Sequence, residues 1–220
     1  MKHNAPKAYR GMGMDGIFAH WYAALTRRDL AQLRDLAAKL GEHFPRGGSV
    51  LEVAPGPGYL AIELAKLRRA ASITGVDISQ TCVDIAQRNA REEGVAVDFQ
   101  QGNASDLPFA DNAFDLIVCR AAFKNFSQPI EALQEIHRTL KPGGEALIID
   151  LRRDVSPEAI NELASGHGWL NGPFVKAIFK YMLVKRAYTQ HDMDQLARQA
   201  GFDSIQIDTN LVSLEIWLRK

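Results

Sequence analysis

Apolar residues along this chain follow two alternating patterns. Short continuous apolar runs bounded by Gly, Pro and Asp are typical of strands buried on both faces of a sheet. Stripes of apolar residues at helical spacing separate these runs. Five runs are therefore expected to form strands, at residues 49–53, 72–77, 95–99, 114–119 and 145–151. The alternation predicts an α/β fold with a parallel sheet covered by helices on both faces.

The pattern changes toward the C-terminal end. A helix is predicted from Gln190 to Ala200, closed by Gly201. Two runs that alternate apolar and polar residues follow it, at 205–207 and 214–218. Because only a short polar segment separates them, we expect a hairpin that adds an antiparallel edge to the parallel sheet.

The helical stripes begin and end at recognisable residues. A leucine stripe after Asp29 predicts a helix that stops at Gly41. Ser79 is expected to cap the helix that follows the second strand, and this helix is expected to end at Gly94. The segment 141–144, Lys-Pro-Gly-Gly, is predicted to turn into the fifth strand.

The chain shows no internal repeat and no linker, so we expect a single domain over 1–220. Within it we distinguish an N-terminal helical cap, a core, a helical insertion over the substrate site, and a final helix with its hairpin. These parts span residues 1–45, 46–151, 152–189 and 190–220. Aromatic residues of the cap and the insertion are expected to cover a small, partly apolar or aromatic substrate: Tyr9, Phe18, Trp21, Tyr22, Trp169, Phe174, Phe179 and Tyr181.

Charge and cysteine content narrow the possible partners. Basic and acidic residues both number 26, and no polybasic run stands out, which argues against a nucleic acid partner. Apolar runs are far shorter than the ~20 residues of a membrane-spanning helix, and no signal peptide is evident, so we expect a cytoplasmic protein. Cys82 and Cys119 have no metal-binding spacing; we expect both to be buried and no metal to be bound.

The candidate ligand site is the glycine turn after the first strand. Residues 56–61 read G-x-G-x-x-A, and Asp77 follows Gly56 by 21 residues at the end of the next strand. This spacing suits a dinucleotide, with Asp77 accepting hydrogen bonds from ribose hydroxyls. Two features weigh against a pyrophosphate. Pro55 and Pro57 lack N–H donors, and Glu52 beneath the turn would attract an ammonium or sulfonium group instead.

Each of these side chains also has a purely structural interpretation. Glu52 could accept hydrogen bonds from backbone amides of the loop, and Asp77 could cap the following helix. Asn103, in the loop after the third strand, could bind a base edge or simply stabilise a turn. The sequence alone leaves these alternatives open.

Five segments in order resemble the class I S-adenosylmethionine-dependent methyltransferases, especially the branch with the ubiquinone and menaquinone C-methyltransferases. They are 51–58 (LEVAPGPG), 75–79 (GVDIS), 102–109 (GNASDLPF), 114–115 (FD) and 140–144 (LKPGG), within a match that covers about 49–151. The resemblance implies a Rossmann-like, doubly wound sheet of seven strands, mostly parallel, with the last strand reversed. It also implies S-adenosylmethionine as the cofactor.

The resemblance also assigns parts of the cofactor to residues of this chain. The methionine part would lie over the turn from Ala54 through Gly56 to Gly58, near Glu52, with the ribose on Asp77. The adenine would lie near Ile78, Asn103 and Ala104, and the backbone at Cys119 and Arg120 would meet the amino acid end. The family turn more often reads G-C-G-T-G, and an Asp often stands where this chain has Asn103.

The expected function is methyl transfer by in-line displacement from the sulfonium to a small molecule. The alternatives are a nicotinamide-dependent oxidoreductase and a cofactor-binding module without turnover. Candidates for a general base come from segments after the fourth and fifth strands and from the insertion: Arg120, Lys124, Asn125, Arg152, Arg153, His167 and His191. None of them is assigned a catalytic role from sequence.

Overall fold

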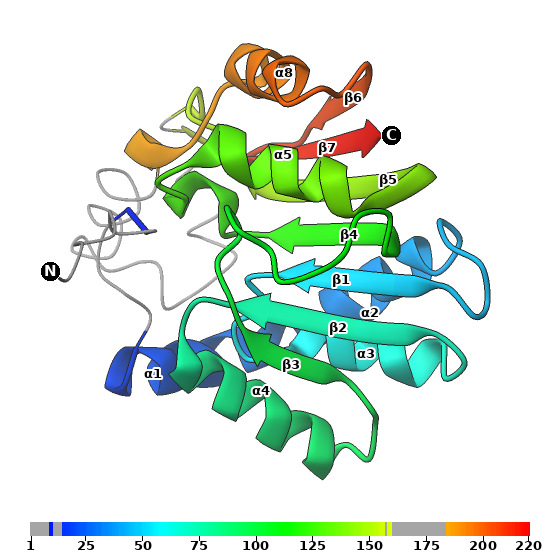
Figure 1. Ribbon diagram of the computed structural model, residues 1–220. Helices are drawn as coiled ribbons and strands as arrows, with labels where there is room; N and C mark the ends of the chain where they lie inside the picture. Colours follow the sequence, from blue (N-terminus) through cyan, green and yellow to red (C-terminus); the bar gives the residue numbers. More distant parts are fainter. Residues whose placement is uncertain (1–8, 11–14, 157, 160–183) are drawn as a thin grey trace, which may run out of the picture.

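The computed structural model describes residues 9–10, 15–156, 158–159 and 184–220, and its centre is a twisted seven-stranded sheet (Figure 1). The strand order is β3-β2-β1-β4-β5-β7-β6. Strands β1 to β5 run parallel, whereas β7 is antiparallel to both β5 and β6. The predicted fold, a mostly parallel doubly wound sheet with an antiparallel C-terminal hairpin, is therefore confirmed. The strands are β1 (Ser49–Val53), β2 (Ser72–Asp77), β3 (Asp98–Gln101), β4 (Phe114–Arg120), β5 (Leu140–Leu151), β6 (Ser204–Thr209) and β7 (Ser213–Arg219).

Helices cover both faces of the sheet, as the alternating pattern requires. One face packs against α2, α3 and α4, and the other against α5 and α8. A further helix, α1, lies beside α4 near the carboxyl ends of the parallel strands (Figure 1). The described α-helices are α1 (Ile17–Thr26), α2 (Leu30–Leu40), α3 (Tyr59–Leu67), α4 (Gln80–Glu92), α5 (Pro129–Thr139) and α8 (Gln190–Gln199). Short 3-10 helices occupy Arg27–Asp29, Phe123–Asn125 and Val184–Arg186.

The two cores explain why the central strands read as continuous apolar runs. Along β4, Leu116 and Val118 point to the α2–α3 side, whereas Ile117 and Cys119 point to the α5–α8 side. Successive side chains of a strand point to opposite faces of the sheet. In a strand buried on both faces, consecutive positions are therefore apolar. Cys82 and Cys119 are both buried, as expected.

The two largest differences from the predicted strand boundaries are at the starts of β3 and β5. The third strand begins at Asp98 rather than at residue 95, because the Val95 N–H donates to the Ala90 carbonyl and continues the end of α4 around Gly94. The fifth strand begins at Leu140, so the segment 141–144 lies inside β5. That segment forms an irregularity in which the pairing with β4 shifts between Phe114 and Leu116.

The sheet reverses its winding between β1 and β4, and this is where ligands bind in open α/β sheets. The chain leaves both strands through left-handed residues, Ala54 (φ 56°) after β1 and Ala121 (φ 60°) after β4. Such a conformation costs a non-glycine residue roughly 1–2 kcal/mol, and strain of this kind gathers at functional sites. The backbone conformation therefore indicates a functional site at the carboxyl ends of β1 and β4.

The described N-terminal segments lie over this end of the sheet. Tyr9 forms an antiparallel bridge with Phe126, and the Arg10 N–H donates to the Asn125 carbonyl at 2.7 Å. Helix α1 belongs to the predicted N-terminal helical cap and packs Ala19 and Ala23 against α4. Phe18 and Trp21, two of the aromatic residues expected to cover the substrate, are 56% and 60% exposed. Tyr22 alone of the predicted α1 aromatics turns toward the glycine turn.

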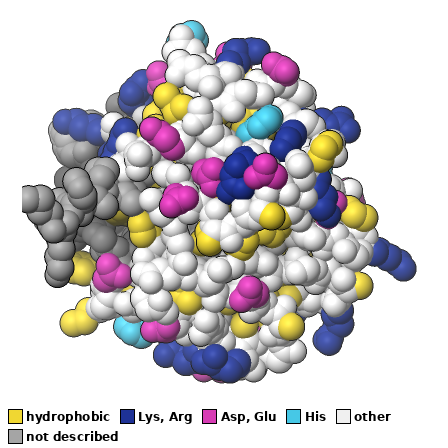
Figure 2. Space-filling view, viewed as in Figure 1, with side chains coloured by type: hydrophobic (Ala, Val, Ile, Leu, Met, Phe, Trp, Pro, Cys, Tyr) yellow, Lys and Arg dark blue, Asp and Glu magenta, His cyan; other side chains and the backbone are white. Residues whose placement is uncertain are grey.

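Charged side chains of both signs alternate on the face that carries α5 (Figure 2). Among the described helices, none is both long and apolar enough to cross a lipid bilayer.

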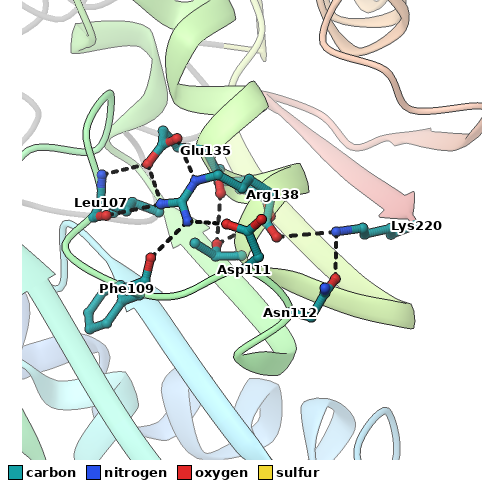
Figure 3. Close-up of polar contacts among 9 residues, drawn as sticks. Leu107, Phe109, Asp111, Asn112, Glu135, Arg138 and Lys220 are labelled. Carbon is teal, nitrogen blue, oxygen red and sulfur yellow. Dashed lines mark hydrogen bonds and ion pairs between the residues drawn. The ribbon is translucent and has the colours of Figure 1, made fainter.

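Arg138 on α5 fixes the loop between β3 and β4, which carries the predicted adenine wall (Figure 3). Its guanidinium donates to the Leu107 and Phe109 carbonyls and pairs with Glu135 and Asp111. Glu135 in turn accepts from the Leu107 N–H at 2.8 Å. Because the planar Arg138 guanidinium donates hydrogen bonds to two loop carbonyls and pairs with two carboxylates, it holds the loop against α5.

Replacing Arg138 with Gln should lower the free energy of unfolding by about 1–3 kcal/mol, because two carbonyls and two carboxylates lose their donor. Hydrogen exchange of the amides at 105–112 should rise in the same variant. The matched control is Arg198→Gln, which breaks an exposed ion pair with Asp194 on α8 and should change stability by less than about 0.5 kcal/mol. Equal losses in urea unfolding of the two variants would contradict this role for Arg138.

Candidate functional site

The glycine turn has the geometry that a ligand-binding turn requires. Gly56 and Gly58 both adopt left-handed backbone conformations, with φ of 55° and 78°. A Cβ at Gly58 would lie 2.6 Å from the Phe99 ring and 2.8 Å from the Ala86 methyl, so only glycine fits between the turn and α4. A Cβ at Gly56 would meet the Tyr22 ring at 3.5 Å. Tyr22 therefore lies over the turn.

Asp77 ties the end of β2 to this turn. Its carboxylate accepts hydrogen bonds from the Gly56 N–H at 3.0 Å and from the Ser79 N–H at 2.9 Å. Ser79, not Asp77, caps α4 by accepting from the Cys82 N–H, as predicted. Burial raises the pKa of Asp77, and the two backbone N–H groups partly offset that rise. Asp77 thus organises the turn from the end of β2.

Glu52 lies beneath the turn and is only 4% exposed. It accepts from the Ala61 N–H at 2.9 Å, in the first turn of α3, so the structural role left open by the sequence is present. Burial raises the pKa of Glu52 to about 8, although the Ala61 hydrogen bond and the Arg120 charge oppose this rise. A cation placed beside Glu52 would favour its ionised form.

The residues predicted to contact adenine lie along the neighbouring edge. Ile78 is 41% exposed, which leaves an apolar side chain next to Asp77. Asn103 accepts from the Ser105 N–H through Oδ1 and from the Asp106 N–H through its carbonyl, so it does stabilise a turn. Its Nδ2 group is the part that could donate to a base. Ala104 is half-buried beside the α5–α8 core.

A buried ion pair lies beside Ala121, the left-handed residue after β4. The Lys124 ammonium lies 2.7 Å from Asp150 Oδ1 and donates to the Ala121 carbonyl at 2.6 Å, and Lys124 is 3% exposed. Asp150 also accepts from the backbone N–H groups of Lys124 and Leu151. Lys124 is therefore committed to holding the left-handed Ala121, which argues against its predicted candidacy as a general base.

Asp150 is a residue that the sequence analysis missed. It ends an apolar strand run just as Asp77 does, so the same criterion would have found it. The neighbouring Asn125 is also buried, and its Oδ1 has no hydrogen-bond partner among the described residues. A buried acceptor without a donor costs roughly 1–3 kcal/mol, which an O–H or N–H group of a ligand could relieve.

The other base candidates are placed less favourably. Arg152 pairs with Asp154 at 2.8 Å, and Arg153 pairs with Asp192. Both arginines therefore have carboxylate partners at a solvent-accessible corner. His191 lines a separate hollow beside α8 and β6, away from the glycine turn, together with Asp154, Thr189, Gln190, Asp194, Ile205 and Ile207. His167 and the insertion aromatics Trp169, Phe174, Phe179 and Tyr181 lie outside the described residues.

Within the part of the chain that the structure describes, no group of three or more His, Cys, Asp or Glu side chains could hold a metal ion. Near the glycine turn, the carboxylates of Glu52 and Asp77 are separately engaged with backbone amides. The site is thus suited to an organic ligand with a cationic part and hydroxyl donors.

Comparisons with known proteins agree with this geometry. A family model described as "Methyltransferase domain" matches residues 51–148. A demethylmenaquinone methyltransferase of Deinococcus radiodurans is 35% identical over 117 residues, which are 53% of this chain and 48% of that protein. A ubiquinone/menaquinone biosynthesis C-methyltransferase of Bdellovibrio bacteriovorus is 34% identical over 104 residues, which are 47% of this chain and 44% of that protein. The chain spans about half the length of these curated relatives.

Among solved structures, one from Methanococcus maripaludis, whose proposed class is S-adenosyl-L-methionine-dependent methyltransferase, superposes with a TM-score of 0.76. It is 22% identical, and the match covers 96% of this chain and 95% of that one, so it shows a shared fold.

Residues 51–148 thus match a methyltransferase domain, and the sheet that contains them has the fold of the Methanococcus maripaludis structure. Within that class the chain resembles the ubiquinone and menaquinone C-methyltransferases, as its sequence motifs predicted. The predicted cofactor, S-adenosylmethionine, agrees with these matches.

The raised pKa of Glu52 gives a testable dependence of stability on pH. Between the unfolded pKa near ~4.3 and the folded pKa of about 8, the folded state holds a proton that the unfolded state has lost. The free energy of unfolding should therefore fall with rising pH across this window because of Glu52. The neutral variant Glu52→Gln should gain stability relative to the native chain from pH 5 to pH 8. Urea unfolding curves that keep a constant difference across this range would contradict the assignment.

Proposed function

We propose that this chain transfers a methyl group from S-adenosylmethionine to a small organic acceptor. The observation that carries the proposal is the placement of two buried carboxylates, Glu52 and Asp77, on either side of a glycine turn at the β1–β4 switch point. One suits the positively charged methionine end of the cofactor, and the other suits the ribose hydroxyls. The methyltransferase domain match over the same residues supports this proposal.

The cofactor would lie across the crevice from Glu52 to the loop after β3. Ala54, Gly56 and Gly58 would hold the methionine part, and Asp77 the ribose. The adenine would lie against Ile78, with Asn103 and Ala104 on the far side. Arg120, at the end of β4, would flank the amino acid end. These nine assignments remain proposals for the binding experiments below.

In this reaction the main task of the protein is to align the acceptor with the cofactor. The sulfonium is already an activated leaving group, so the chain must hold acceptor and cofactor in line and exclude water. Such alignment contributes roughly 7–11 kcal/mol in intramolecular model reactions. Burial raises the pKa of the Tyr9 and Tyr22 phenols near the turn, so they stay protonated at neutral pH and act as donors rather than as bases. No residue is assigned as a general base.

Ligand-dependent stability tests the proposal directly. S-adenosylmethionine and S-adenosylhomocysteine should raise the unfolding temperature, since a ligand at 100 times its Kd adds about 2.7 kcal/mol to stability. NAD and NADH should leave the unfolding temperature unchanged. Stabilisation by a nicotinamide dinucleotide alone would favour an oxidoreductase. Binding of S-adenosylhomocysteine without methyl transfer to any tested acceptor would favour a module without turnover.

Asp77→Asn should weaken S-adenosylhomocysteine binding by about 10- to 100-fold in calorimetry. The variant loses charge-assisted hydrogen bonds to the ribose, each worth roughly 1.5–3 kcal/mol. Its new N–H₂ group also faces the donors of Gly56 and Ser79. The matched control is Asp98→Asn at the exposed start of β3, which should bind as the native chain does. Equal affinity of both variants would remove Asp77 from the binding site.

A further inference from the structure

Helix α1 carries three large apolar side chains that remain in contact with solvent. Ile17 is 86% exposed, and more than half of Phe18 and of Trp21 is exposed as well. The other exposed large hydrophobic residues of the described ranges lie one by one on separate segments. Single apolar residues are normal on a protein surface, whereas a group of them on one helix indicates a contact surface. These three residues are called the α1 face below.

The opposite side of α1 is fixed to the rest of the chain. Ala19 and Ala23 are buried against Cys82 and Ile85 of α4. The Tyr59 hydroxyl donates to the Ala23 carbonyl at 3.0 Å. The residues of the α1 face, at spacing i, i+1 and i+4, project from the side of the helix that is turned away from α4. The α1 face therefore has a defined orientation near the carboxyl ends of the parallel strands (Figure 1).

The composition of α1 differs from that of the other described α-helices. Residues 17–26 include no Asp, Glu, Lys or Arg, whereas each of the other described α-helices contains charged residues of both signs. The first charged residue after α1 is Arg27, which is exposed. Unlike Arg34 on α2, Arg27 has no ion-pair partner among the described residues. An uncharged helix with Trp and Phe exposed, and a free arginine at its edge, is typical of helices that lie in the interface of a lipid bilayer.

The size of the α1 face also favours lipid over a protein partner. Its three side chains expose roughly 400 Å² of apolar surface, about half of the ~800 Å² that each partner buries in a stable protein interface. Insertion of a few apolar side chains into a bilayer has no such minimum area. The helix has ten residues and is therefore about 15 Å long, which is too short to cross a bilayer and suits a helix lying along its surface.

We propose that the α1 face binds the surface of a phospholipid bilayer. Phe18 and Trp21 insert at the boundary between headgroups and acyl chains, and Arg27 pairs with a lipid phosphate. Because α1 itself is uncharged, apolar insertion supplies most of the binding, and zwitterionic lipid is sufficient for it. The inference is independent of the proposed methyl transfer. It concerns the outer side of α1, whereas Tyr22 on the inner side lies over Gly56 of the glycine turn.

The test measures partition of the full chain into vesicles by flotation. One set of vesicles is phosphatidylcholine, and the other is an equal mixture of phosphatidylcholine and phosphatidylglycerol. The native chain should float with both sets, and more of it with the mixture, because Arg27 gains an anionic surface. Tryptophan emission should shift to shorter wavelength on the vesicles, and brominated acyl chains should quench it. Trp21→Ser should lose both fluorescence changes.

Phe18→Ser and Trp21→Ser should each lower the partition coefficient by about tenfold, because each removes a large apolar side chain from the contact. Arg27→Gln should lower it by about fivefold on the mixed vesicles and by less on phosphatidylcholine. The matched control is Leu67→Ser at the end of α3, a residue that is 51% exposed but stands alone, and its partition coefficient should equal the native one. Thermal unfolding and S-adenosylhomocysteine binding check that each variant is folded.

Absence of the native chain from both sets of floated vesicles overturns the inference, as does equal partition of the native chain and Trp21→Ser. A dimer in sedimentation equilibrium that Trp21→Ser dissociates, without vesicle binding, would assign the α1 face to a second copy of the chain and would also overturn it. Each of these outcomes leaves the proposed methyl transfer intact, because S-adenosylhomocysteine binding is measured separately.

Discussion

The site depends on one hydrogen-bonded bridge, the Asp77 carboxylate between Gly56 and Ser79. It joins the end of β2 to the turn after β1 and to the start of α4, so three elements keep a fixed relation. Gly58 reinforces this relation because its missing side chain lets the turn touch Phe99 and Ala86. Without the bridge, the left-handed turn would lose the acceptor that orders its amide groups.

The electrostatics of the crevice are set by buried charged groups. Glu52 and Asp77 lie beside the glycine turn, so a sulfonium there would meet the opposite charge. The buried Lys124–Asp150 pair carries no net charge as a unit. Removing one partner of such a pair typically costs 3–5 kcal/mol, so its role is structural as well as electrostatic.

The sequence predicted most of the fold because burial on both faces leaves a local signal. The runs at β1, β2, β4 and β5, the Ser79 cap and the terminal hairpin were all readable from residue order. The start of β3 was not, since a backbone contact between Val95 and Ala90 decides it. Asp77 was found because it ends a strand, and Glu52 because a carboxylate interrupts an apolar strand just before the glycine turn.

The position of β7 between β5 and β6 has a consequence for biosynthesis. Until residues 213–219 emerge from the ribosome, the edge of β5 and the whole of β6 have no partner. Unpaired apolar edges recruit other chains, and long-range pairing is slow to form. The nascent chain is thus most prone to aggregate just before its last strand is synthesised, and slower translation of that stretch would lengthen the vulnerable interval.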